Sequence, residues 1–85
     1  MKISVYDTYV KKNSNIIMHF DILIEKSKTV NEAITYGKKY LASKKIFDKQ
    51  LTTKECKFCH VENVTGEIEE KIRKDGYYII EMENC

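Results

Sequence analysis

The stretch IIMHFDILIE, residues 16–25, constrains the fold more than any other part of the chain. In a β-strand successive side chains point to opposite faces of the sheet, so every second residue shares a face. One face of this stretch is uniformly apolar and must be buried: Ile16, Met18, Phe20, Ile22 and Ile24. A slip of one residue in register would move that whole row into water. The opposite face carries His19 and Asp21, flanked by Ile17 and Leu23.

A second strand and a turn precede this segment. Residues 3–10, ISVYDTYV, are rich in β-branched and tyrosine residues, a composition that favours a strand. The polar run KKNSN at residues 11–15 is typical of a turn. We therefore expect the two strands to form a β-hairpin.

Two capping signals predict helices after the hairpin. Thr29 followed by Glu32 is a capping box, and an apolar stripe at helical spacing follows it. Gly37 lies within that stripe, so we expect this helix to approach the sheet closely. Thr52 followed by Glu55 is a second signal of the same kind, and it predicts a short helix through residues 56–60, CKFCH.

A third helix and a last strand complete the prediction. The helix covers about residues 66–75, with Ile68 and Ile72 facing inward and Gly76 suited to end it. The strand at residues 77–83 has Tyr77, Ile79 and Glu81 on one face. Its other face is expected to be buried together with Met18, Phe20 and Ile22, and carries Tyr78, Ile80 and Met82. We also expect His19 to be more exposed than Phe20.

The predicted order of elements, β-β-α-α-α-β, indicates an α+β fold. A three-stranded sheet, made of the N-terminal hairpin and the C-terminal strand, needs a covering layer, which the helices supply. We therefore expect a two-layer sandwich. Because the chain has 85 residues and no proline, we expect a single domain over residues 1–85.

The composition argues against several kinds of partner. The net charge of +2 is small and there is no base-stacking platform with a basic rim, so we expect no nucleic acid partner. No apolar run has the length of a signal-peptide core or a membrane span, which predicts a cytoplasmic protein without membrane contact. Cytoplasmic thiols stay reduced, and an odd number of cysteines, three, argues against a disulfide framework.

Several segments together resemble a known family. VYDTYV, MHFDILI, KKYLAS, ECKFCH and GYYIIEM are similar, in this order and over nearly the whole chain, to a small bacterial family of uncharacterised proteins described as a domain of unknown function. The resemblance implies a compact bacterial α+β protein and implies no activity. It places seven residues in family-typical segments: Asp7, His19, Asp21, Cys56, Cys59, His60 and Cys85.

The motif Cys-x-x-Cys-His, within ECKFCH at residues 55–60, first suggests two kinds of cofactor. Its spacing fits covalent haem attachment, but the lack of an export signal and the small core disfavour haem. A zinc site could use Cys56 and Cys59, although no second cysteine pair is present. The remaining zinc ligands would have to come from His60, His19 or Cys85.

Two further interpretations of the motif need no cofactor. Cys56, at the start of the predicted short helix and beside Lys54 and Lys57, has features that lower the pKa of a thiol, which would suit redox chemistry. However, no βαβ pattern of the thioredoxin type leads into the motif. A reduced cysteine also packs as a small hydrophobe, and we favour this structural role over any single alternative.

The sheet face opposite the helices is a second candidate site. If both larger helices cover one face, the other face carries His19, Asp21, Tyr77 and Glu81, together with Ile17, Leu23 and Ile79. Such a mixture suits a ligand site or a homodimer surface, and His19 with Asp21 could form an acid–base pair. A solvated face is favoured over a catalytic pair, because no nucleophile, glycine-rich loop or metal-ligand repeat accompanies it.

The sequence therefore predicts a small binding or interaction module rather than an enzyme, with a homodimer as one option and the partner unknown. The alternative hypothesis is a zinc- or thiol-dependent protein that uses Cys56, Cys59 and His60.

Overall fold

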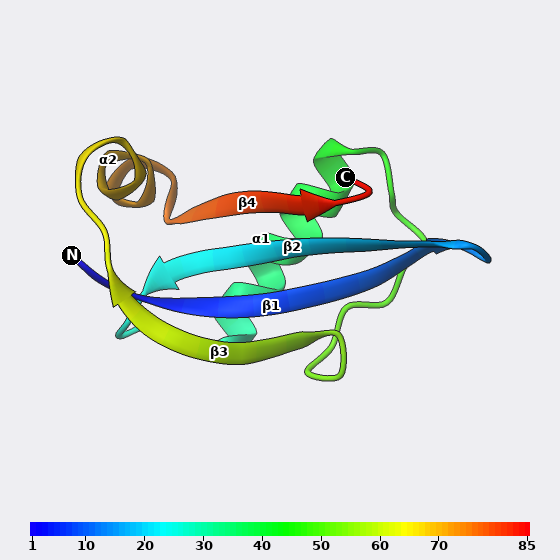
Figure 1. Ribbon diagram of the computed structural model, residues 1–85, viewed down its shortest axis with the longest axis horizontal. Coiled ribbons are helices and arrows are strands. Elements are labelled where there is room, and N and C mark those ends of the chain that lie inside the picture. The colour runs from blue at the N-terminus through cyan, green and yellow to red at the C-terminus, as the bar shows by residue number, and fades with distance from the viewer.

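The computed structural model describes residues 1–85 as one antiparallel four-stranded sheet with two helices (Figure 1). In chain order the elements are β1 (Lys2–Asn13), β2 (Ile16–Glu25), α1 (Val30–Ser43), β3 (Cys56–Asn63), α2 (Gly66–Asp75) and β4 (Tyr77–Glu83). The strands lie in the order β3-β1-β2-β4, so the hairpin is the centre of the sheet. The predicted α+β class is confirmed, whereas the prediction of three strands and three helices is wrong. Neither helix is long and apolar enough to cross a membrane.

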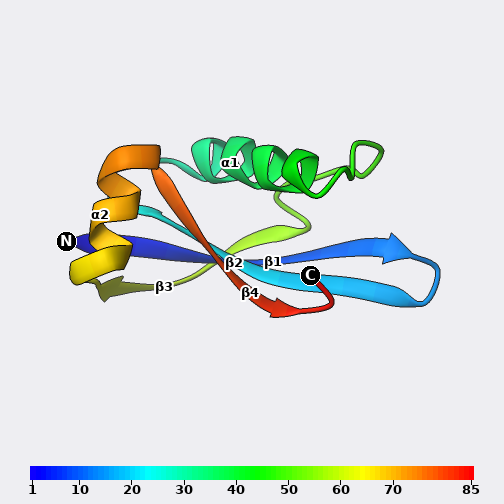
Figure 2. The same cartoon turned by 90° about the horizontal axis from the view of Figure 1, so that it is seen from above.

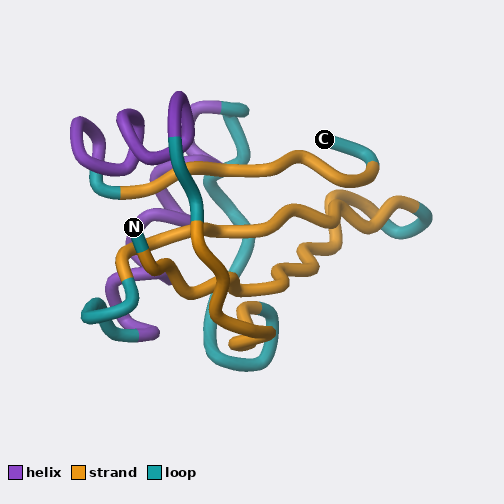
Figure 3. The backbone as a smooth tube through the Cα atoms, turned by 60° about the vertical axis from the view of Figure 1, so that its left-hand side comes forward, coloured by secondary structure: helices purple, strands orange, loops and turns teal.

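The predicted hairpin is formed by β1 and β2, and it is the longest unit of the molecule. Its turn, at residues 14–15, extends past the helices (Figures 2 and 3). The side-chain oxygen of Asn13 accepts a hydrogen bond of 3.0 Å from the backbone N–H of Asn15, which stabilises the turn. In the resulting register Asp7 lies opposite Asp21, and Tyr9 lies opposite His19.

Helix α1 covers one face of the sheet (Figure 2). Its N-terminus has the predicted capping box, in which the side chains of Thr29 and Glu32 each accept a hydrogen bond from the other's backbone N–H. Gly37 permits the close approach: a Cβ there would lie 2.9 Å from Ile22 Cδ1 and 2.5 Å from Leu51 Cδ2. The core below the helix includes three side chains that are fully buried as predicted: Met18, Phe20 and Ile22.

Helix α2 packs on the opposite face, at one end of the sheet. Its Ile72 is buried in a second, smaller core with Ile3, Val5, Leu23 and Val64. Gly76 ends the helix at a φ of 92°, the left-handed conformation expected of a glycine in this position. The helices therefore lie on different faces, which corrects the prediction of a two-layer sandwich. We call the part of the second face that α2 does not cover, around Asp7, His19 and Asp21, the open face.

Residues 56–63 form the edge strand β3, so the predicted short helix through CKFCH is wrong. The capping signal closes one turn, in which the Thr52 N–H and hydroxyl both donate to Glu55 Oε1, at 2.8 and 2.7 Å. The backbone N–H groups of Glu55 and Cys56 bond the Thr52 carbonyl in the same turn. From Cys56 onward the chain pairs with β1. Pairing with the free edge of β1 satisfies more backbone N–H and C=O groups than a short helix would, and the first turn of a helix is costly to form.

The two faces of β4 are reversed relative to the prediction. Ile79 lies opposite Ile22, so the face under α1 carries Tyr77, Ile79 and Glu81. Of the residues predicted to be buried there, Tyr78 and Ile80 lie on the other face, and Met82 has no partner in β2 because it lies at a register shift. Tyr78 and Ile80 are half-buried and Met82 is 53% exposed. Both faces of this strand begin with apolar residues, so the alternation did not determine which face is buried. A register shift opposite His19 and Phe20 also changes the pairing of the last residues of β4.

Candidate functional site

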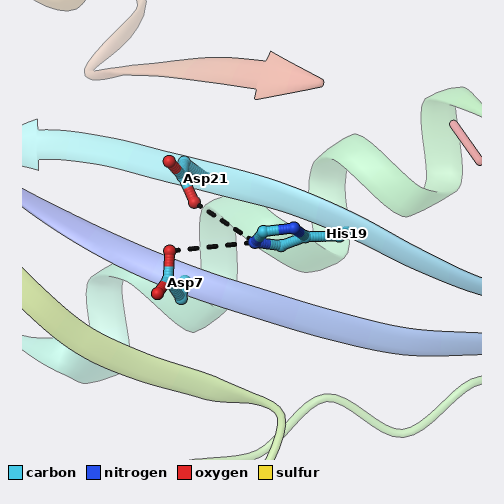
Figure 4. Close-up of side chains that lie close together, drawn as sticks. All are labelled: Asp7, His19 and Asp21. Carbon is cyan, nitrogen blue, oxygen red and sulfur yellow. Dashed lines mark ion pairs between the residues drawn. The ribbon is translucent and has the colours of Figure 1, made fainter. Parts of the chain in front are cut away.

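Three ionisable side chains meet on the open face: Asp7, His19 and Asp21 (Figure 4). Asp7 on β1 lies directly opposite Asp21 on β2, and His19 precedes Asp21 by two residues, which places it on the same face. One ligand atom from each residue lies within 4.8 Å of the others. All three project from the two central strands, so the hairpin register fixes their relative positions. We call these three residues the Asp–His–Asp cluster.

The Nε2 atom of His19 faces both carboxyl groups but bonds neither (Figure 4). It lies 3.8 Å from Asp7 Oδ1 and 3.7 Å from Asp21 Oδ1, whereas an N–H···O hydrogen bond spans about 2.7–3.2 Å. Both His19 Nε2 and Asp21 Oδ1 are shielded from solvent and have no hydrogen-bond partner. Each such atom costs roughly 1–3 kcal/mol, so a group that accepts electron pairs from all three residues would stabilise the cluster.

The two carboxyl groups of the cluster differ in their proton affinity. Partial burial and the neighbouring Asp7 raise the pKa of Asp21 to about 6. The pKa of Asp7 is lowered, chiefly because a protonated Asp21 can donate a hydrogen bond to it. Like charges directly opposite each other on neighbouring strands repel, so this pair binds positive charge readily, either as a proton or as a metal ion.

Tyr9 holds the ring of His19 in place. The two residues lie opposite each other in the hairpin, and their rings stack with centroids 4.1 Å apart and planes 9° apart. Tyr9 is half-exposed, whereas the His19 side chain is 18% exposed, so the tyrosine shields the imidazole from water. The stacked orientation leaves the Nε2 edge of the imidazole facing the carboxyl groups (Figure 4).

A β-bulge in β3 changes the direction of the Cys-x-x-Cys-His motif. Tyr6 of β1 pairs with Phe58, but the next pair along β1 joins Val5 to His60, so Cys59 is an extra residue without a partner. Without the bulge, Cys59 and His60 would point to opposite faces of the sheet. With it, their side chains meet, and Cys59 Sγ lies 3.2 Å from His60 Nδ1.

Cys59 and His60 lie beside the Asp–His–Asp cluster. Partial desolvation together with the nearby carboxylates of Asp7 and Asp21 raises the pKa of the Cys59 thiol. The Nε2 atom of His60 lies 2.9 Å from Glu62 Oε2, so the imidazole is oriented by a carboxylate. The open face thus brings together three of the five metal ligands proposed from the sequence: His19, Cys59 and His60.

The other two cysteines lie on the α1 side of the sheet. Cys56 is buried in the core under α1, where desolvation raises the pKa of its thiol. Cys85 packs against the same core, and its thiol donates hydrogen bonds to the carbonyls of His19 and Glu83. Cys56 and Cys59 therefore point to opposite faces of β3, so the geometry does not support a shared ion, a haem attachment or a disulfide within the motif.

Two residues proposed for the ligand face, Tyr77 and Glu81, also lie on the α1 side. Tyr77 stacks on Tyr36, with ring centroids 4.6 Å apart. Glu81 accepts hydrogen bonds from Lys44 at 2.8 Å and Tyr40 at 2.5 Å, and these two donors lower its pKa. Both residues therefore contribute to packing and helix attachment rather than to the open face.

The hydrophobic members proposed for the same face are also separated. Ile17 is 53% exposed, but Leu23 is buried under α2 and Ile79 packs under α1. These three side chains therefore form no contiguous surface for a second copy of the chain.

Asp7 is the site residue that the sequence reasoning did not assign. Its signal was present in the hairpin, because a turn centred on Ser14 places Asp7 opposite Asp21 and beside His19. The turn was expected over five residues, which left the register of the hairpin undefined.

Comparisons with known proteins show which family and which solved structure the chain resembles. The chain matches the family described as a domain of unknown function (DUF2024) over residues 1–82. It is also similar to the NMR structure of protein NE1680 from Nitrosomonas europaea, with 40% sequence identity and a TM-score of 0.89 over 100% of this chain and 99% of that chain. The chain matches no curated protein. These similarities agree with the α+β fold and with the family resemblance of the sequence.

Proposed function

Because the chain belongs to the DUF2024 family, whose description names no activity, we propose from its own geometry that it is a binding module for a divalent transition-metal ion. The ligands are the carboxylates of Asp7 and Asp21 and the Nε2 atom of His19. One observation carries the proposal: two of these ligand atoms are shielded from water and unbonded while they face a common point.

The spacing of the ligand atoms supports a metal ion more than a hydrogen-bond network. Two ligands about 2.0–2.2 Å from the same tetrahedral or trigonal ion lie roughly 3.3–3.8 Å from each other. The His19 Nε2 atom lies 3.7 and 3.8 Å from the two carboxylate oxygens, close to that range and beyond hydrogen-bond distance. A small movement of side chains would bring all three atoms to bonding distance of one ion.

The charges of the cluster point the same way. Two carboxylates that face each other across neighbouring strands repel. An ion with two positive charges bound between them would attract both carboxylates and outweigh that repulsion. An ion also removes the proton held by Asp21, because ligands bind metals in their deprotonated form. Because the pKa of Asp21 is about 6 in the metal-free protein, this carboxyl is mostly deprotonated at neutral pH, and a proton competes with the ion only at lower pH.

The donor set indicates which ions fit. One imidazole nitrogen and two carboxylate oxygens suit Zn²⁺, Fe²⁺ and Mn²⁺ better than Ca²⁺, which takes six to eight oxygen ligands. Three protein ligands on a rigid hairpin leave a further position for another donor. The stacked ring of Tyr9 fixes the imidazole as an outer partner of a metal ligand does.

Isothermal titration calorimetry with Zn²⁺ tests this proposal on protein purified without a histidine tag. We expect the wild-type protein to bind one equivalent. The variants Asp7→Asn and Asp21→Asn should bind at least tenfold more weakly, because each removes a charged ligand.

The matched control is Asp48→Asn, which makes the same chemical change at an exposed residue outside the cluster. It should bind Zn²⁺ as the wild type does. Equal affinities in all four proteins, or binding that persists when both cluster aspartates are replaced, would contradict the proposed site.

A further inference from the structure

We propose that Cys59 supplies a fourth, thiolate ligand to the ion held by the Asp–His–Asp cluster, so that the site selects a thiophilic ion such as Zn²⁺ over Mg²⁺ and Mn²⁺. This inference rests on the proposed metal-binding function and adds which class of metal ion the site prefers. A donor set of two carboxylates, one imidazole and one thiolate would complete a four-coordinate site.

The bulge in β3 is the first observation behind this proposal. Bulges redirect side chains and are common beside functional sites. Here the extra residue is Cys59 itself, which lies between the partners of Val5 and Tyr6 and two residues along β3 from Lys57, the partner of Asp7. A regular strand would have returned the next residue, His60, to the α1 side of the sheet.

The position of the Cys59 thiol is the second observation. Cys59 lies on the open face of β3, next to the strand that carries Asp7, and the negative charges of Asp7 and Asp21 both act on its thiol. Cys59 is solvent-exposed, and a single torsion about its Cα–Cβ bond moves the sulfur, so the thiol is free to turn toward an ion beside Asp7. Cys56 and Cys85, packed against the core under α1, have no such access.

His60 provides an acceptor for the thiol proton. Binding converts the Cys59 thiol and a metal ion into a metal-bound thiolate and one proton. His60 Nδ1 lies 3.2 Å from Sγ, and Nε2–H donates toward Glu62 at 2.9 Å, which leaves Nδ1 free to accept that proton. The imidazole then passes the proton to solvent, because its side chain is 49% exposed.

Titration with Co²⁺ in place of Zn²⁺ tests the role of Cys59 by absorption spectroscopy. We expect the wild-type protein to show visible ligand-field bands together with a sulfur-to-cobalt charge-transfer band in the near ultraviolet. Cys59→Ser should keep the ligand-field bands, lose the charge-transfer band and bind Co²⁺ about tenfold more weakly. Cys85→Ser, the matched control, should keep the charge-transfer band, and circular dichroism checks the fold of each variant.

The outcomes separate this inference from the function on which it rests. Ligand-field bands without charge transfer in the wild type would overturn the role of Cys59 and leave the Asp–His–Asp site standing. A charge-transfer band that survives in Cys59→Ser would assign the thiolate to another cysteine and would also overturn it. No cobalt spectrum at all would overturn both proposals. As a second readout, Zn²⁺ but not Mg²⁺ should slow alkylation of Cys59.

Discussion

At the scale of single residues, the open face is dominated by a repulsion between two carboxyl groups. Asp7 and Asp21 occupy directly opposed positions of the hairpin, where like charges destabilise a sheet. Below a pH of about 6 the metal-free protein limits this cost by keeping a proton on Asp21, whose pKa is raised from 3.8 to about 6 by burial and by Asp7. His19, between the two, forms a hydrogen bond to neither.

Asp21→Asn should therefore stabilise the metal-free protein at pH 7. Its amide can donate a hydrogen bond to Asp7 and carries no charge, so we expect a gain of about 1 kcal/mol, or about 4–8 °C in melting temperature. The folded protein binds more protons at Asp21 than the unfolded chain does between pH 3.8 and about 6. The stability contributed by this carboxyl is thus fully present below pH 3.8 and is lost as the pH rises through 6.

Thermal melts in the presence of a chelator measure this effect as a difference between variant and wild type. The difference should be small at pH 4 and should grow until the pH passes about 6. A difference that stays constant from pH 4 to pH 7 would show that Asp21 does not titrate in this window. Asp48→Asn should show no such growth, because its side chain is 82% exposed.

At the scale of elements, the sequence predicted the hairpin and both long helices but not how the later elements pair. The apolar row of β2 defined one buried face, although Ile16, beside the turn, is exposed, and the capping box at Thr29 defined where α1 begins. A capping signal precedes β3 and the residues of β3 show no clear alternation, so their strand conformation depends on the free edge of β1. Both faces of β4 are apolar, so its sequence alone did not show which face packs under α1; the pairing with β2 determines this.

Only part of the candidate site could be predicted from the sequence. His19 and Asp21 followed from the alternation of one strand, whereas Asp7 required the register of the hairpin. Cys59 required the strand conformation of residues 56–63, and His60 required in addition the bulge in β3, which no local pattern in CKFCH predicts. The expected partnership of Cys56 with Cys59 came from their spacing, which suits a helix or a turn, whereas residues three apart in a strand point to opposite faces.

The contact between α1 and the sheet provides a prediction at this scale. Gly37→Ala would place a Cβ 2.5 Å from Leu51 Cδ2 and 2.9 Å from Ile22 Cδ1, and both of those side chains are buried. The overpacking should outweigh the better helix propensity of alanine, which is worth about 1 kcal/mol, and leave a net loss of roughly 1–3 kcal/mol in the free energy of unfolding.

Urea denaturation measures that loss. Asn31→Ala, at an exposed position of the same helix, isolates helix propensity and should be neutral or slightly stabilising. A Gly37→Ala protein as stable as the wild type would mean that α1 can move away from the sheet at little cost.

At the scale of the whole molecule, the sheet is a shared layer between two cores. Helix α1 covers one face, and α2 covers one end of the other (Figure 2). The Asp–His–Asp cluster lies on the second face where α2 gives no cover, so its residues combine rigid backbone positions with partly exposed side chains. A metal ion bound there would join the two central strands, and it would raise stability in proportion to its affinity for the folded protein.

The central claim is that His19 Nε2 is a metal ligand, and nitrogen-15 NMR of the histidine rings tests it most directly. The chain has two histidines, His19 and His60, so each ring can be resolved. On addition of one equivalent of Zn²⁺, we predict a large shift of the Nε2 resonance of His19 that is absent in the Asp7→Asn, Asp21→Asn double variant. A His19 ring unchanged by stoichiometric Zn²⁺, with or without a response at His60, would contradict the account.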